Sequence, residues 1–387
     1  MNRIGRGARR RMAAALACAL VFAPVAGQPP PLAEAEREAI LAHGPWPPPW
    51  QRDPSNRVSG HPAAIAFGER LFDDRRLSGP GTLACATCHQ PQRGFTDGLA
   101  VAHGAAAGER NTPALANVRW QRWFGWDGAH DNLWAQSLRP IVDPREMASD
   151  FSRVAALVRT DPILAADYRR AFGADPPADD EALAVDVGKA LAAYQETLVT
   201  ARTPFDAYRD ALARGDAAAA AKYPAAAARG ARLFVGKGRC NLCHLGPAFT
   251  NGEFQDIGIP FFVAGGGVDR GRHEGIRRLK ASRFNLLGPY SDDPSRGTAT
   301  ATRHVAAEHR NFGEFKVPSL REVARTPPYM HNGSLATLRE VVRHYSMLDL
   351  DRVHADGGEL LRPLELSAAE IDDLVAFLES LSGEKAR

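Results

Sequence analysis

One pentapeptide pattern occurs twice in the sequence and carries its clearest chemistry. Residues 85–89 (Cys-Ala-Thr-Cys-His) and 240–244 (Cys-Asn-Leu-Cys-His) both have the form Cys-x-x-Cys-His. This is the attachment signature of c-type haem, in which two thiols bond the porphyrin and the adjacent imidazole binds the iron. One copy alone could be a zinc half-site or a thioredoxin-like redox pair, but two copies with the same adjacent His disfavour both. We predict two covalent haems, held by the residues Cys85, Cys88, His89, Cys240, Cys243 and His244.

The N-terminal residues have the pattern of a secretory signal peptide. An Arg-rich start is followed by an apolar run from Met12 to Ala26 that ends in small residues. We predict a signal peptide over residues 1–27, too short to be a stable membrane span. Cys18 could instead be a lipoprotein acceptor, but the apolar run continues beyond it. Export together with covalent haem attachment predicts a periplasmic protein.

Composition limits the remaining possibilities. The four cysteines after Cys18 all belong to the two motifs, so no disulfide is expected. The formal net charge of +3 is nearly balanced, which predicts neither nucleic-acid binding nor a polybasic membrane contact. No later segment approaches the length of a transmembrane helix. A chain of 387 residues with 44% hydrophobic residues is long enough for two domains with sizeable cores.

The elements that position the two motifs form an internal repeat. Residues 68–72 (Gly-Glu-Arg-Leu-Phe) precede the first motif, residues 230–234 (Gly-Ala-Arg-Leu-Phe) precede the second, and a Phe-Thr turn follows each. Apolar spacings predict helices over 154–172 and 180–200, an Ala-rich linking helix over 211–230 that breaks near Pro224, and a capped helix from Ser367 to Leu381. The predicted fold is mainly α, with two cytochrome c-like domains, each carrying one covalently bound c-type haem.

The domain limits follow from this repeat. We expect an extended N-terminal arm over 28–60, an N-terminal domain over 61–225 and a C-terminal domain over 226–387. The proline-rich stretch 45–50 favours an arm rather than a packed element, held on the domain surface by Trp46 and Trp50.

Taken together, the sequence resembles the bacterial di-haem cytochrome c peroxidase family, which includes the MauG enzymes. The segments that carry the resemblance span nearly the whole mature chain. They are 71–73, 76–78, 110–113, 126–128 with Leu133 and Gln136, 146–147, 315–321 and 328–333. The resemblance implies that the N-terminal haem reacts with peroxide and that the C-terminal haem passes electrons.

The resemblance also implies a calcium ion between the domains. Its protein ligands would be the side chain of Asn111 and the carbonyl oxygens of Thr326 and Pro328. Such oxygen ligands suit calcium. Without the resemblance, Asn111 would be a turn residue before Thr-Pro.

The sixth ligand of the second haem distinguishes members of the family. Typical members have a Met fourteen residues after the His of a Tyr-x-His-x-Gly run, and counting from His331 reaches Tyr345, the ligand type of MauG-like members. A phenolate favours ferric and higher-valent iron, whereas a thioether favours the reduced state. Met347 and, more weakly, Met330 stay open as ligands, and Tyr345 could also be a packed aromatic side chain.

The first haem needs an open or displaceable sixth site for peroxide. The resemblance implies a distal ligand at His103, although a loop His is more often solvated. Relatives supply a distal Glu where this chain has Trp134, so the acid–base group is unassigned. The candidates are His130, Asp131 and Glu146, and a salt bridge is an equally good interpretation of Glu146.

An inter-haem Trp is also implied by the resemblance, but Ala116 occupies its position. Trp120, Trp123 and Trp126 lie nearby, and we select Trp123 as the candidate relay, with packing as the alternative.

These residues support three functions. The first is a periplasmic peroxidase that reduces hydrogen peroxide with electrons from a small cytochrome c or a copper protein (cupredoxin). The second is a MauG-like enzyme that uses peroxide to oxidise aromatic residues of a partner protein, which Tyr345 favours. The third, a non-enzymatic electron carrier, is the weakest, because by resemblance a simple carrier would not require the long inter-haem loops of this family. The resemblance also implies a possible homodimer.

Overall fold

The computed structural model describes residues 32–260, 262–263, 266–353 and 360–383. The expected signal peptide lies outside this part of the chain. Helices dominate the described residues, so the prediction of a mainly α fold is confirmed. None of the helices in these residues has both the length and the apolar character needed to cross a membrane.

One group of helices surrounds the first motif. It comprises α2 (Pro62–Asp73), α3 (Cys85–Cys88), α4 (Leu133–Val142), α5 (Phe151–Thr160), α6 (Pro162–Phe172) and α7 (Asp180–Gln195). Their apolar faces share one core, in which Phe67 and Trp134 are fully buried. The helix expected over 154–172 is two helices, because Asp161 caps α6 and Pro162 occupies its first turn, where the missing N–H costs nothing.

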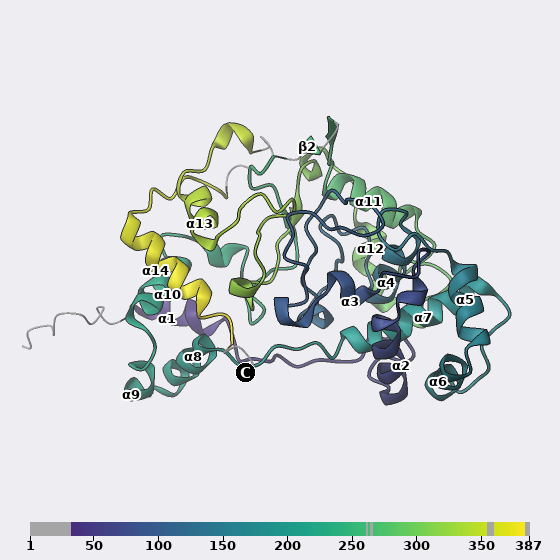
Figure 1. Cartoon of the computed structure of the whole chain (residues 1–387). Coiled ribbons are helices and arrows are strands. Elements are labelled where there is room, and N and C mark those ends of the chain that lie inside the picture. The colour runs from purple at the N-terminus through teal and green to yellow at the C-terminus, as the bar shows by residue number, and fades with distance from the viewer. Residues whose placement is uncertain (1–31, 261, 264–265, 354–359, 384–387) are drawn as a thin grey trace, which may run out of the picture.

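A second group surrounds the second motif and lies at the opposite end of the molecule (Figure 1). It comprises α1 (Glu34–Leu41), α8 (Pro204–Arg214), α9 (Ala217–Ala220), α10 (Ala225–Val235), α13 (Leu338–Ser346) and α14 (Ala368–Glu379). The predicted break at Pro224 separates α9 from α10, and the predicted capping box of Ser367 and Glu370 opens α14. Phe249 and Phe377 are buried at the centre of this second core.

The glycine of each repeat allows two helices to cross closely. A Cβ on Gly68 of α2 would lie 2.0 Å from the carbonyl oxygen of Ala190 in α7. A Cβ on Gly230 of α10 would lie 1.9 Å from the carbonyl oxygen of Asp373 in α14. Only glycine fits at either crossing. The two halves are therefore built on the same helix pair, and the prediction of two cytochrome c-like domains is confirmed.

The remaining elements connect the two groups. They are α11 (Arg272–Ala281), α12 (Thr300–His304) and four short strands, in which β1 (Phe254–Gln255) pairs antiparallel with β4 (Phe315–Lys316) and β2 (Phe262–Val263) with β3 (Gly267–Val268). Phe284 and Tyr290, which follow α11, pack against the first core. The segment after the second motif therefore returns to the first half of the molecule.

The expected extended arm is wrong for residues 34–41, which form α1 and pack against α8 and α10. Beyond α1, residues 42–61 run along one edge of the molecule beside residues 196–203, which join α7 to α8 (Figure 1). Trp46 is 3% exposed rather than a surface anchor, and its Nε1 donates to the carbonyl oxygen of Thr200 at 3.0 Å.

The domain boundary expected at residue 225 stays a prediction. Helix α8 precedes that boundary, yet its Phe205 and Tyr208 lie in the second core. We propose that the domains meet within residues 196–203.

Glu196 begins this connection and generates a prediction about pH. It is 5% exposed, and the Oγ of Ser59 donates to its Oε2 at 2.8 Å. Burial raises the pKa of Glu196 to about 7, a direction that the nearby Asp53 reinforces. Because folding raises this pKa, the stabilising contribution is complete below about pH 4.5, the value of an unperturbed Glu, and is lost as pH rises through about 7.

We expect Glu196→Gln to remove this loss, so that the variant is more stable than wild type at pH 8 by up to about 3 kcal/mol and no more stable at pH 4. Chemical denaturation of the holoprotein at both pH values measures the difference. Glu38→Gln, at an exposed position of α1, is the matched control. An equal effect of Glu196→Gln at both pH values would contradict the prediction.

Candidate functional site

The first motif forms a single helical turn that places its three reactive side chains together. Helix α3 spans the two cysteines, and the N–H of His89 closes the turn on the carbonyl oxygen of Cys85 at 2.9 Å. The Nδ1 of His89 lies 3.0 Å from the carbonyl oxygen of Phe95, a residue in the left-handed region at φ 61°. A proton on Nδ1 leaves Nε2 as the atom that can bind a metal.

The second motif repeats this arrangement. Cys240–Leu242 forms a 3-10 turn, and the N–H of His244 bonds the carbonyl oxygen of Cys240 at 2.9 Å. The Nδ1 of His244 lies 3.0 Å from the carbonyl oxygen of Phe249, whose φ is 52°. Each proximal imidazole is thus oriented by one backbone carbonyl, the type of partner that fixes metal-binding histidines.

Electrostatics separate these motifs from redox dithiols. Burial raises the pKa of both Cys85 and Cys240 to about 12, whereas a reactive cysteine has a lowered pKa. Burial also lowers the pKa of His244 to about 4 and lowers that of His89, so both imidazoles are neutral and can act as ligands. In the described part of the chain, no group of three or more His, Cys, Asp or Glu residues could hold a metal ion. The raised thiol pKa values disfavour a thioredoxin-like pair.

A large cavity opens beside the first motif and suits a haem. It is lined by Cys85, Cys88 and His89 on one side and by residues of 102–147 on the others. Lys316 of β4 also reaches it, and its Nζ donates to the Oε1 of Gln121 and, at 3.2 Å, to the carbonyl oxygen of Trp123.

Lys316 supplies a test of whether a haem fits this cavity. Burial lowers the pKa of Lys316 to about 8, and no carboxylate of the described residues lies within ion-pair distance of its Nζ. A buried cation without a counter-ion is costly. The carboxylate of a haem propionate would supply the counter-ion for Lys316, so the residues present fit the cofactor.

Two polar side chains face the same cavity from the segment after Trp126. His130 lines it, and burial lowers the pKa of His130 to about 4. Gln136 of α4 also lines it, and its Oε1 is buried without a hydrogen-bond partner. A buried acceptor normally has a hydrogen-bond partner, so the unpartnered Oε1 of Gln136 indicates that a donor binds in the cavity. The sequence signal for Gln136 was its place in the Leu133-x-x-Gln136 run, to which we assigned no role.

The other candidates for the first site are placed less favourably. Glu146 lines the cavity, but Arg139 Nη1 donates to its Oε1 at 2.6 Å, which is the salt-bridge interpretation. Asp131 accepts from the Oγ1 of Thr302 at 2.6 Å and does not line the cavity. His103 is exposed and is also absent from the lining, so the structure gives its distal role no support.

Trp123 is buried but does not line the cavity. The guanidinium of Arg272 lies 4.3 Å from the centre of its ring, in addition to the ammonium of Lys316 at its carbonyl. Two adjacent cations disfavour removal of an electron from the ring. The relay role of Trp123 remains a prediction that these charges oppose.

At the second motif, Tyr345 and Met347 are placed very differently. Burial raises the pKa of the Tyr345 phenol, and the neighbouring thiols of Cys240 and Cys243 raise it further. The phenol therefore lies close to the attachment cysteines. Met347 follows the end of α13 and is 72% exposed. Met330 is half-buried in a turn at φ 74°.

The residues expected at calcium lie where the two halves meet. Asn111 is 7% exposed, its backbone N–H donates to the carbonyl oxygen of His331 at 2.7 Å, and its Nδ2 donates to the carbonyl oxygen of Leu99 at 2.7 Å. The latter bond turns Oδ1 away from Leu99. Thr326 packs against the loop of the first motif, since a Cβ on Gly94 would lie 2.8 Å from its Cγ2. The structure thus brings the 326–331 segment against residues 94–111.

The fold and the paired motifs define a two-domain, di-haem c-type cytochrome. A model of the di-haem cytochrome c peroxidase family matches residues 62–214. The methylamine utilization protein MauG of Methylorubrum extorquens is 37% identical over 334 residues, 84% of this chain and 80% of that protein. Cytochrome-c peroxidase IdrP1 of Denitromonas iodatirespirans is 35% identical over 330 residues, 82% and 81% of the two chains.

A solved structure agrees with these relatives. The crystal structure of a MauG-like protein associated with microbial copper homeostasis has a TM-score of 0.65 and 27% identity, and the match covers 88% of this chain and 96% of that one. The chain belongs to the di-haem cytochrome c peroxidase family and is an oxidoreductase of the peroxidase class. Membership implies two c-type haems.

Lys316 yields a prediction for the holoprotein. A nearby cation favours the reduced, less positive haem, so Lys316→Met should lower the reduction potential of the first haem. The free energy of reduction should become less favourable by on the order of 1 to 2 kcal/mol, for an effective dielectric constant of about 20. Spectroelectrochemical titration measures it. Lys316→Arg should retain the wild-type potential, and Lys280→Met removes the same charge from an exposed position of α11. An unchanged first-haem potential in Lys316→Met would contradict the placement of Lys316 beside the first haem.

Proposed function

We propose that this chain is a di-haem enzyme that consumes hydrogen peroxide in the cavity beside His89. Cys85 and Cys88 would hold the first haem and Cys240 and Cys243 the second, with His89 and His244 as proximal ligands. The support is the repeated Cys-x-x-Cys-His turn, with each imidazole oriented by a Phe carbonyl at 3.0 Å. When bound, the haem supplies the iron at which the peroxide bond is broken.

The chain's own contribution at the first site is proton handling and orientation. His130 is neutral at physiological pH, because burial lowers its pKa to about 4, so its free ring nitrogen can take a proton from peroxide. The unpartnered Oε1 of Gln136 can accept a hydrogen bond from the same molecule and orient it. We therefore assign His130 as the acid–base group and Gln136 as the orienting group, and leave Glu146 to its ion pair with Arg139.

One observation carries the choice between the two enzyme functions. The Tyr345 phenol is near enough to the thiols of the second motif for them to raise its pKa, whereas Met347 is 72% exposed. We propose His244 and Tyr345 as the ligands of the second iron. Metal binding would remove the phenol proton, as it does for coordinated thiols and water. An anionic ligand stabilises the oxidised states of iron, so the second haem would be a poor acceptor of electrons from a mild donor.

This ligand set favours oxidation of aromatic residues in a partner protein, the function of MauG-like enzymes. The relative with 37% identity carries the name MauG. Reduction of peroxide with electrons from a small cytochrome c or a cupredoxin is the second candidate, and it is favoured by the relatives named cytochrome-c peroxidase. We also propose export to the periplasm through residues 1–27 and calcium at Asn111, Thr326 and Pro328.

We expect Tyr345→Met to convert the protein towards the second candidate. A thioether in place of a phenolate should raise the reduction potential of the second haem by on the order of 0.2 V, within the range of about 0.8 V that axial ligands cover. Reduced cytochrome c should then be consumed with peroxide faster than by wild type. A spectroscopic peroxide titration with and without reduced cytochrome c measures both quantities.

Met347→Leu is the matched control and should leave the spectrum and the potential unchanged. Rapid consumption of reduced cytochrome c by wild type, or a second-haem spectrum altered by Met347→Leu and not by Tyr345→Met, would refute the proposed ligand and the function built on it.

The calcium proposal predicts a response to chelation. Removal of calcium should lower the thermal stability of wild type, because a bound ion at 100 times its dissociation constant contributes about 2.7 kcal/mol to the folded state. Asn111→Ala should lose most of this response. Thermal unfolding with EGTA, with added calcium and with added magnesium as the control cation measures it. The same calcium response in wild type and Asn111→Ala would count against the site.

A further inference from the structure

A fully buried ion pair lies next to the second motif. The side chains of Arg321 and Asp206 are 1% and 2% exposed. The Nη1 of Arg321 donates to Oδ2 of Asp206 at 3.0 Å and its Nη2 to Oδ1 at 2.9 Å, a two-point contact. The N–H of Thr203 donates to Oδ2 of the same carboxylate at 2.8 Å, at the start of α8. Asp206 is therefore held from two directions.

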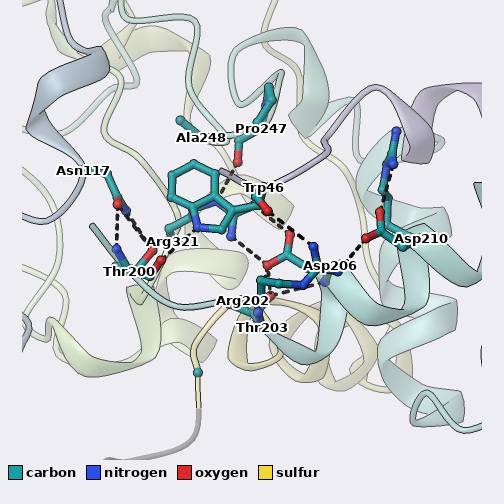
Figure 2. A network of polar contacts seen from close by, with 12 residues as sticks. Trp46, Asn117, Thr200, Arg202, Thr203, Asp206, Asp210, Pro247, Ala248 and Arg321 are labelled. Carbon is teal, nitrogen blue, oxygen red and sulfur yellow. Dashed lines mark hydrogen bonds and ion pairs between the residues drawn. The ribbon is translucent and has the colours of Figure 1, made fainter. Parts of the chain in front are cut away.

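Trp46 covers this ion pair. The guanidinium carbon of Arg321 lies 3.6 Å from the centre of the Trp46 ring, which is a cation–π contact. The ring is 3% exposed and is fixed by the bond from its Nε1 to the carbonyl oxygen of Thr200. Figure 2 shows these side chains converging from the 42–61 segment, the 196–203 connection, α8 and the segment of Arg321. The pair is thus closed off from water by a residue far away in the sequence.

The remaining donor of Arg321 reaches the loop that follows His244. Its Nε donates to the carbonyl oxygen of Pro247 at 2.6 Å, and the Oγ of Ser319 donates to that of Ala248 at 2.6 Å. The next carbonyl, of Phe249, is the one that orients His244. Each of the three consecutive carbonyls of 247–249 is therefore bonded to a side chain. Arg321 bonds the carbonyl two residues before the one that orients His244.

The corresponding carbonyl after the first motif accepts from a neutral donor, which makes the comparison informative. The carbonyl two residues before Phe95 belongs to Arg93, and it accepts from the Oγ1 of Thr96 at 2.9 Å. A neutral hydroxyl of the same loop does there what a buried guanidinium does beside the second motif. The two proximal histidines have the same geometry, so the ion pair is a difference in charge rather than in shape.

We propose that Arg321, balanced by Asp206 and covered by Trp46, is a positioning and charge-balancing residue for the second haem. It orients His244 through the carbonyls of 247–249, and its charge acts in a buried, low-dielectric environment where charges interact strongly. Asp206 cancels most of that charge. This role of Arg321 rests on the proposed function in one respect, that the second haem is the one that exchanges electrons.

The test is the sign of two shifts in reduction potential. Asp206→Asn leaves the cation unbalanced and should raise the potential of the second haem, since reduction adds one electron next to a positive charge. Arg321→Met leaves the carboxylate unbalanced and should lower it. The first haem should keep its potential in both variants. Spectroelectrochemical titration of the holoprotein, which needs no peroxide, measures all four values.

Matched and conservative variants separate charge from loosened packing. Arg229→Met and Asp373→Asn make the same changes in a pair on the surface of α10 and α14, where Arg229 is 46% exposed, and should leave the second haem unchanged. Arg321→Lys keeps the charge but not the two-point contact, so it should leave the potential near wild type and shift the EPR g-values of the ferric second haem.

Where the single charge variants do not accumulate as holoprotein, Trp46→Ala and Trp46→Phe provide the test. Trp46→Ala admits water to the ion pair and should shift the g-values of the second haem only, and Trp46→Phe should restore them. Shifts of the same sign in Asp206→Asn and Arg321→Met, equal shifts at both haems, or no shift beyond the surface controls would overturn the proposal. Absence of peroxide turnover would instead refute the proposed function and leave these potentials measurable.

Discussion

In both halves of the molecule a backbone carbonyl, presented by a Phe in the left-handed region, lies 3.0 Å from the Nδ1 of the histidine that closes a Cys-x-x-Cys turn. This contact decides which ring nitrogen carries the proton and therefore which one is free for iron. It requires the loop after each motif to be held still. The rest of the structure holds these two loops in place, one beside a cavity and the other near Tyr345.

Each loop is supported by a close crossing of two helices that only glycine permits. Gly68 lies against α7 in the first half, and Gly230 lies against α14 in the second. Each crossing builds a core beneath its motif. The halves are then joined by exchange of segments: α1 packs with the second core, and Phe284 and Tyr290 pack with the first. Because the 42–61 and 196–203 segments run side by side between the halves, a side chain such as Trp46 can act on a site that lies far along the chain.

Around the shared geometry, the two sites differ in their charges. The first has a cavity with an ammonium that contacts no carboxylate of the described residues, a neutral imidazole and an amide oxygen without a hydrogen-bond partner, which suits a carboxylate-bearing cofactor and a small hydrogen-bonding substrate. The second has a phenol beside the thiols and a balanced ion pair behind the proximal loop. In the proposed function, peroxide would react at the first site, and the second would control electron flow.

Features set by local covalent and backbone chemistry could be predicted from the sequence alone. The two attachment motifs, the repeat, the break at Pro224 and the capping box of α14 depend on residues a few positions apart, so their spacing is sufficient. The preference for Tyr345 over Met347 came from the family resemblance, and the structure adds that Tyr345 is half-buried whereas Met347 is 72% exposed. Sequence alone does not give this difference in exposure. Nor does it give the exposure of His103, the helix at 34–41 or the pairing of Arg321 with Asp206, which lie 115 positions apart. Burial and long-range contact are properties of the folded whole, and they decided which of the candidate residues line the cavity beside His89.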